Sequence, residues 1–296
     1  MAMASLIKAL GRNLEDTRDS ERGRRHFRRR TSNAGERVGG FVPPVPTPTP
    51  GTRPRVLRAI FLPYVNTTTQ VNLYTPHLKS SSDQVLYHMG KGATPTNAQY
   101  TTLLNAPALH RGIEFFQLAD ISANAATIKA KGLDFISYDM EGGANGTPAA
   151  EMADPVGSMQ SAKNICTANG LLLQGAAARA TSDASAINFS QYCDLFHYQI
   201  QGYQEVPSTS PPPNYYQETT DMVTKVRTHN ATSPITVQVS TGRAAEAGLT
   251  MVDTFIKRWN EVQPLDVAGI STWFSNDATS LGFLNDFVVW FDTNWH

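Results

Sequence analysis

The sequence predicts an α/β fold, namely a single (β/α)8 barrel of the TIM type preceded by a disordered arm. Three observations support this prediction. Eight short apolar segments fall within about 220 residues, helical patterns separate most of them, and neither GxGxxG nor GxxxxGK[ST] occurs. Strands that alternate with helices imply a parallel sheet, and eight such units are what a closed barrel needs. The alternative is an open doubly wound sheet, which usually carries a glycine-rich phosphate loop.

The eight segments are short apolar runs of the kind that buried parallel strands show. They cover residues 56–65, 85–89, 112–119, 133–140, 171–177, 194–201, 235–240 and 267–274. The helices between them are clearest late in the chain. Asp154 and Pro155 predict a helix start and Gly170 its end, while the apolar spacing in 249–262 and 281–291 predicts two more helices.

Residues 1–54 are expected to form a disordered arm, and residues 55–296 the barrel domain. The arm carries eleven Lys or Arg against five acidic residues, and 43–54 reads PPVPTPTPGTRP, which favours an extended linker. Neither part holds enough apolar residues to offset the entropy of ordering. The basic arm is either a solvated tail or an electrostatic tether to a polyanion, because the body, with fourteen basic and twenty acidic residues, would repel one.

Composition leaves several properties open. Hydrophobic residues make up 41% of the chain, enough for a sizeable core, but no run is long enough to span a bilayer. Cys166 and Cys193 have no metal-type spacing, so they are either one disulfide or two buried thiols. A body rich in Thr, Asn, Gln and Ser and poor in Lys hints at a secreted or extracellular protein, although no signal peptide is readable in Met1–Leu10.

The strongest candidate site is a pair of carboxylates where the fourth predicted strand ends. Because side chains alternate along a strand, Ser137, Asp139 and Glu141 share one face, opposite Tyr138 and Met140. The Cα atoms of the two acids would lie roughly 6 to 7 Å apart. Repulsion and partial burial raise the pKa of one member of such a pair, which can then act as a general acid. The alternative is that Asp139 binds a neighbouring backbone amide and Glu141 is a solvated loop residue.

The stretch Gly132–Glu141 resembles the DxxDxDxE strand of family 18 glycoside hydrolases, the chitinase-like barrels. Asp134, Asp139 and Glu141 occupy three of its four acidic positions, and Ser137 stands where the family has its middle Asp. The resemblance implies that Glu141 is the general acid and that Asp139 orients and polarises the acetamido group of the substrate. The departure at Ser137 leaves a non-catalytic relative as an alternative.

A second similarity lies at the last predicted strand. Gly269–Trp273 is similar to the strand that places a Trp under the sugar in those enzymes, and Tyr64 would correspond to an aromatic residue at the end of the first strand. The likeness thus extends over the whole body, although it is specific at two strands only. Trp273 could equally be a filler of the barrel core.

Several glutamines fall within or at the ends of predicted strands, and a ring of them would suit a hydroxyl-rich ligand. They are Gln117, Gln174, Gln199, Gln201 and Gln238. Alternatively, several of them point outward or satisfy backbone groups. His88 and His197 are interpreted as structural histidines. The seventh predicted strand ends without a carboxylate, and Glu246 follows in a loop, so a glycosidase with catalytic acids on two strands is disfavoured.

These features predict a glycoside hydrolase that acts on an amino-sugar-containing glycan through Asp139 and Glu141, with an oligosaccharide ligand bound by Trp273, Tyr64 and the glutamines. No cofactor and no metal are expected. Two alternatives remain, a non-catalytic barrel that binds carbohydrate or protein, and a scaffold protein tethered by its basic arm.

Overall fold

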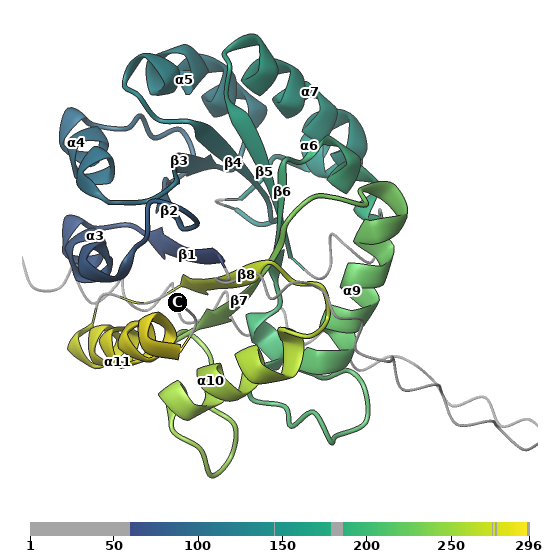
Figure 1. Cartoon of the computed structure of the whole chain (residues 1–296). Helices are drawn as coiled ribbons and strands as arrows, with labels where there is room; N and C mark the ends of the chain where they lie inside the picture. The colour runs from purple at the N-terminus through teal and green to yellow at the C-terminus, as the bar shows by residue number, and fades with distance from the viewer. Residues whose placement is uncertain (1–59, 145, 179–185, 274, 276, 295–296) are drawn as a thin grey trace, which may run out of the picture. The chain divides into compact units, whose positions relative to one another are not determined.

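The protein is described by a computed structural model that covers residues 60–144, 146–178, 186–273, 275 and 277–294. The arm expected at 1–54 lies outside these residues. Within them the chain forms a barrel of parallel strands (Figure 1), each hydrogen-bonded to the next, and β8 pairs with β1 to close it. The strands are β1 (Ile60–Val65), β2 (Gln84–His88), β3 (His110–Phe115), β4 (Phe135–Met140), β5 (Leu172–Ala178), β6 (Leu195–Gln199), β7 (Ile235–Ser240) and β8 (Gly269–Trp273). A TIM-type barrel is thereby confirmed.

Helices pack around the outside of the barrel (Figure 1). The α-helices are α3 (Thr68–Tyr74), α4 (Asn97–Asn105), α5 (Leu118–Ala130), α6 (Ala149–Ala153), α7 (Pro155–Ala168), α9 (Tyr215–His229), α10 (Met251–Val262) and α11 (Ala278–Asn294). Short 3-10 helices are η1 (Thr75–His77), η2 (Ala186–Tyr192) and η3 (Gln201–Tyr203). Between β5 and β6 the described residues contain the 3-10 helix η2, and after β6 the 3-10 helix η3 precedes α9.

Local sequence signals explain where α7 begins and ends. The Asp154 carboxylate accepts a hydrogen bond of 2.9 Å from the Gly157 amide, as an N-cap does, and Pro155 takes the first helical position. Gly170 follows the helix with φ of +66°, a conformation that glycine adopts without strain. The start and end predicted for this helix are confirmed.

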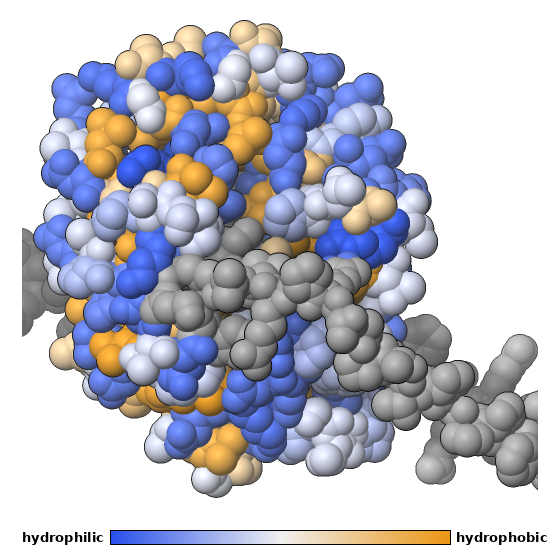
Figure 2. Space-filling view, viewed as in Figure 1, coloured by the Kyte–Doolittle hydropathy of each residue, from blue (hydrophilic) through white to orange (hydrophobic). Residues whose placement is uncertain are grey.

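The main apolar core lies between the sheet and the helices. Outward-facing strand residues such as Ile113, Ile136 and Val237 are fully buried in it. Tyr138 belongs to the same face, because its hydroxyl donates a hydrogen bond to Glu151 of α6. Its neighbours along β4 must therefore face the barrel interior. On the face that Figure 2 shows, hydrophilic residues predominate, with apolar patches between them.

The barrel interior is polar over much of its length, unlike the aliphatic layers usual in such barrels. Its buried polar side chains include Glu114, Ser137, Asp139, Gln174, His197, Thr236, Gln238 and Ser271. A small apolar cluster of Leu86, Phe135 and Leu195 lies separately from the main core. Phe135 fills space over Gly112, where an added Cβ would come within 2.6 Å of the ring.

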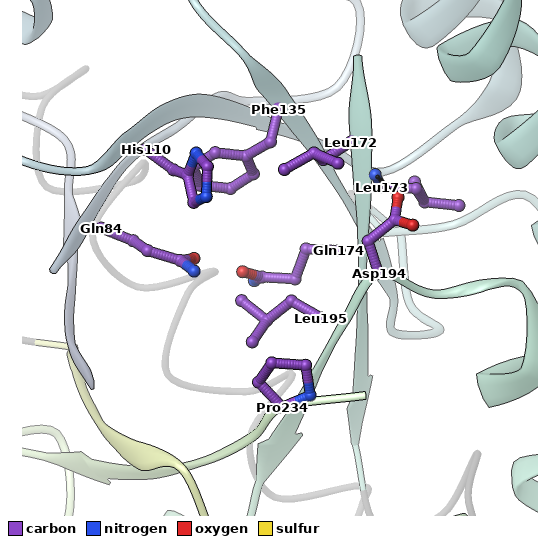
Figure 3. Close-up of a pocket in the computed structure, with 9 residues that line it drawn as sticks. All are labelled: Gln84, His110, Phe135, Leu172, Leu173, Gln174, Asp194, Leu195 and Pro234. Atoms are coloured by element: carbon purple, nitrogen blue, oxygen red, sulfur yellow. Dashed lines mark hydrogen bonds between the residues drawn. The ribbon is translucent and has the colours of Figure 1, made fainter. Parts of the chain in front are cut away.

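A cavity of about 90 Å³ lies where several strands begin (Figure 3). Its lining includes the first residues of β2 through β6, and Gln84 and Gln174 point into it from opposite sides. Ligands bind at the opposite end of such barrels, where strands end. This cavity is therefore not the candidate active site. Among the described residues, no helix combines the length and the apolarity needed to cross a membrane.

Candidate active site

Asp139 and Glu141 lie at the C-terminal end of β4. Asp139 is 2% exposed, whereas Glu141 follows the last strand residue and is exposed at the mouth of the barrel. Thr147 fixes the loop that follows, because its hydroxyl donates to the Asp139 carbonyl (2.6 Å) and its amide to the Glu141 carbonyl (2.7 Å). Gly146 permits this close return, since an added Cβ would meet the Glu141 carbonyl oxygen.

A third carboxylate, Glu114 of β3, completes the cluster and was missed in the sequence. It is 1% exposed and lies opposite Ser137 in the β3–β4 register. Ser137 Oγ donates to Glu114 Oε2 at 2.9 Å, and His88 Nδ1 of β2 lies 2.7 Å from Glu114 Oε1. The serine that breaks the acidic pattern is therefore bonded to an acid from the neighbouring strand.

Two glutamines among those singled out in the sequence join this network. Gln199 at the end of β6 donates to Asp139 Oδ1 at 3.1 Å, and Gln174 of β5 donates to Ser137 Oγ at 3.1 Å. Side-chain hydrogen bonds thus join β3, β4 and β5 through Glu114, Ser137 and Gln174, and join β4 to β6 through Asp139 and Gln199. The hydrogen bond from Gln199 orients the Asp139 carboxylate before any ligand binds.

The environment raises the pKa of both β4 acids. Burial raises the pKa of Asp139 well above its usual range, the charges of Glu114 and Glu141 raise it further, and the hydrogen bond from Gln199 opposes them. For Glu141, partial removal from water and the charge of Glu114 raise the pKa, while His88 and Arg243 lower it. Both groups therefore keep a proton to higher pH than ordinary carboxyl groups, which suits a general acid.

His88 has a larger part in this site than the structural role interpreted from the sequence. Burial by itself would lower its pKa, but the hydrogen bond and charge of Glu114, together with the charge of Glu141, raise it. Its ring packs edge-on against Phe116, with 5.2 Å between ring centroids. His197, by contrast, is fully buried against Thr236 and has the expected structural role.

An open pocket of about 530 Å³ lies beside Glu141. It is lined by the ends of β2, β3 and β4 and by the loops that follow them, and the residues are His88, Gly90, Lys91, Phe116, Glu141, Gly142, Gly143 and Gly146. The glycines of the loop after β4 leave space beside the carboxylate. A ligand group in this pocket would contact Glu141 directly.

Trp273 ends β8 on the rim of the barrel and is 37% exposed, so it is not a filler of the core. Its ring packs on Gly242, where an added Cβ would lie 2.9 Å from the indole. In the backbone register Trp273 pairs with both Tyr64 and Ser240. The side chain of Tyr64 lies outside the described structure, so only its backbone position beside Trp273 is given.

The other predicted ligand residues are placed differently. Gln238 is a buried interior residue of β7, and Gln117 lies beyond β3 at the N-cap of α5. Gln201 begins η3, because β6 ends at Gln199, so these two glutamines do not continue one strand face. Neither Gln117 nor Gln201 has a hydrogen bond to Asp139, Glu141 or Glu114 within the described structure.

Glu246 is a structural residue. Its carboxylate is paired with Lys257 at 2.6 Å and with the fully buried Arg258, both on α10. Both cysteines are buried free thiols, which decides between the two alternatives left by the sequence. Within the described ranges, no group of three or more His, Cys, Asp or Glu side chains is arranged to hold a metal ion.

Comparison with known proteins identifies the class of fold. No protein-family model and no curated protein matches the chain in sequence. The catalytic domain of a family 18 chitinase from the fern Peteris ryukyuensis matches in structure with a TM-score of 0.54 and 13% identity, over 78% of this chain and 98% of that one. A chitinase from Chromobacterium violaceum matches with a TM-score of 0.52 and 12% identity, over 78% and 99%.

A third similar structure is described as a xylanase-A-amylase inhibitor protein, with a TM-score of 0.53 and 13% identity over 78% of this chain and 98% of that one. Identities this low show the fold alone. The chain therefore has the barrel of the family 18 chitinases, in a divergent form. The resemblance seen in the sequence of β4 and β8 is confirmed at the level of the fold.

Proposed function

We propose that this protein is a glycosidase that hydrolyses glycans containing N-acetylated amino sugars. The observation that carries the proposal is the pair Asp139 and Glu141, one buried and oriented by Gln199, the other at the mouth of the barrel with a raised pKa. This pair lies at the end of a barrel where catalytic residues are found. The similarity of fold to chitinases supports the same substrate class.

In the proposed reaction Glu141 is the acid. Its carboxyl proton passes to the glycosidic oxygen as the bond from that oxygen to the anomeric carbon breaks. The carbonyl oxygen of the sugar's own acetamido group forms the new bond to the anomeric carbon. The Glu141 carboxylate then accepts a proton from water, whose oxygen attacks the anomeric carbon and releases the acetamido oxygen. Two displacements at one carbon retain its configuration, and one protein acid serves both.

Asp139 prepares the nucleophile in this scheme. Its Oδ1 accepts the hydrogen bond from Gln199, which leaves Oδ2 to interact with the N–H of the acetamido group. That interaction orients the acetamido oxygen toward the anomeric carbon and polarises the amide. The exposed indole of Trp273 offers a face on which a sugar ring can stack.

A second candidate function is binding without turnover. Ser137 at an acidic position of the family pattern favours it, and one structure of similar fold is described as an inhibitor protein. A binding protein needs the pocket beside Glu141 and the exposed indole of Trp273, but it does not need a protonated Glu141. Turnover therefore separates the two candidates.

The test uses the full chain and a panel of aryl glycosides that includes N-acetylglucosaminides and the matching glucosides. We expect aryl alcohol release from the N-acetylated substrates only, because the glucosides lack the attacking acetamido oxygen. Comparable release from both would contradict the proposed mechanism. No release from any member, with N-acetylated oligosaccharides still raising the Tm, would instead establish the binder.

A further inference from the structure

We propose that Glu114 supplies, from β3, the carboxylate that β4 lacks at Ser137, and that it is a positioning residue for Asp139 and Glu141. The inference rests on the function proposed above and identifies a residue of the same site that the motif does not contain. The acidic pattern requires an acid at position 137, and the protein has a serine there. The structure holds an acid one hydrogen bond away from that serine.

The strand register is the first support. Glu114 and Ser137 are paired positions on β3 and β4, so both side chains extend from adjacent backbone points toward the interior. Asp139 follows two residues later on the same face of β4. The carboxylate of Glu114 therefore lies beside the interior-facing side chains of β4. In the family pattern all the acids come from β4, whereas here one of them comes from β3.

Burial is the second support. Glu114 is 1% exposed, and a buried carboxylate without partners would cost several kcal/mol. Two partners surround it, the Ser137 hydroxyl and the His88 ring, each within 2.9 Å. A barrel that needed only to fill this position could use an aliphatic residue, as most such barrels do. A buried acid with its own counter-ion indicates a requirement for charge at this position.

The surrounding charges show what that negative charge does. His88 of β2 contacts Glu114 directly, the charge of Glu114 acts on Asp139 and Glu141, and Arg243, in the loop after β7, acts on Glu141 with the opposite sign. The Glu114 charge raises the pKa of both β4 acids. It thus favours the protonated form of Glu141, which the proposed reaction requires at its first step.

The decisive variant moves the acid back to β4. Glu114→Ser combined with Ser137→Asp exchanges the two ends of the hydrogen bond and keeps the number of carboxylates unchanged. Glu114→Gln removes the charge, and Glu114→Ser alone is the matched control for the exchange. Two readouts are taken, the carboxyl 13C shifts of Asp139 and Glu141 titrated without substrate, and the pH profile of kcat/KM on a substrate that the wild type cleaves.

We expect Glu114→Gln to lower the pKa of both β4 acids, to move the alkaline limb of the profile to lower pH, and to reduce kcat/KM at neutral pH about tenfold or more. The double variant Glu114→Ser/Ser137→Asp should return both pKa values, and the alkaline limb of the pH profile, toward those of the wild type. Unchanged titrations in Glu114→Gln, or an exchange that behaves like Glu114→Ser, would overturn the proposal. Where Glu114→Gln does not fold, the comparison of the exchange with the wild type decides the same question.

The substrate-free titration keeps this test separate from the proposed function. A wild type without turnover would refute the glycosidase, whereas the shifts of the Asp139 and Glu141 carboxyls would still show whether Glu114 controls them. A residue needed only for folding would change the Tm of the variants but leave the pH dependence of the folded protein in place. Only a positioning role predicts recovery of that pH dependence by moving the acid to β4.

Discussion

Glu114 on β3 accepts a hydrogen bond of 2.9 Å from Ser137 on β4, the one residue that departs from the acidic pattern of that strand. Together with Asp139 and Glu141, Glu114 forms a cluster of three carboxylates with His88 as counter-ion. The apparent loss of an acid on one strand thus coincides with a buried acid on the next.

Gln199→Leu should weaken catalysis by removing the hydrogen bond to Asp139 Oδ1. A hydrogen bond to a charged group contributes on the order of 1.5–3 kcal/mol, so kcat/KM should fall by about tenfold to a hundredfold. The pKa of Asp139 should rise further, because that bond is the interaction that opposes burial. Gln201→Leu is the matched control, since Gln201 lies two residues on in η3 and, within the described part of the chain, has no hydrogen bond to the carboxylates. Equal losses in both variants would show that Gln199 has no special role.

Trp273→Ala should weaken the binding of N-acetylated oligosaccharides by about tenfold, as measured by calorimetry, because it removes the exposed indole from the barrel rim. The Tm should change little, since the side chain is more than one-third exposed. Gly242→Ala should weaken binding less, because the new methyl group displaces the ring rather than removing it. Tyr216→Ala, which removes an exposed aromatic residue from α9, is the control and should bind as the wild type does. Unaltered binding by Trp273→Ala would show that the Trp273 indole is not a stacking surface for the sugar.

His197 should make the protein sensitive to acid. Burial lowers its pKa to about 3, below the usual 6.5, so the folded state favours the neutral ring. The stability it contributes is complete above about pH 6.5 and is lost as the pH falls toward 3, by about 1.4 kcal/mol per pH unit. His197→Gln should flatten this dependence in denaturant titrations. The slopes are compared rather than the absolute stabilities, since Asp139 and Glu141 contribute with the opposite sign in both proteins. Equal slopes for wild type and His197→Gln would contradict the assignment.

Cys166 and Cys193 should be unreactive in the folded protein. Burial raises the pKa of Cys166 to about 12 and also raises that of Cys193, so neither holds an accessible thiolate. A chromogenic disulfide reagent should therefore label neither thiol in buffer and both in guanidinium chloride. The Tm should be the same with and without reductant. Rapid labelling of either thiol under native conditions would show that this thiol is accessible to solvent and would contradict the prediction.

The sequence is sufficient to predict the strands because buried parallel strands leave a strong apolar signal. Each of the eight segments overlaps one observed strand, and the errors are at the ends. β2 begins at Gln84 and β3 at His110, before their segments, while β3 stops at Phe115 and β6 at Gln199, before their segments end. The early end of β6 explains why Gln199 reaches Asp139 and Gln201 does not. Strand ends depend on which residues hydrogen-bond to the neighbouring strand, and periodicity contains no information about that.

The two β4 acids were predictable because they are close in sequence and their chemistry follows from alternation along one strand. Glu114 and His88 were not, since Glu114 meets Ser137, and His88 meets Glu114, only through the register of three strands. Glu114 lies inside an apolar segment, and a single acid there gives no local signal. The pairing of Glu246 with Arg258 was hidden for the same reason, since it joins a loop to the interior of α10.

The most direct test of the central claim is to measure the hydrolysis and the binding of an N-acetylglucosamine tetrasaccharide by the wild type and by Glu141→Gln in parallel. The proposed function predicts that the wild type cleaves it and that Glu141→Gln loses about a thousandfold or more in kcat while its Kd changes by less than about threefold, because the amide keeps the shape of the side chain without its proton. Cleavage by Glu141→Gln at the wild-type rate would contradict the assignment of Glu141 as the acid.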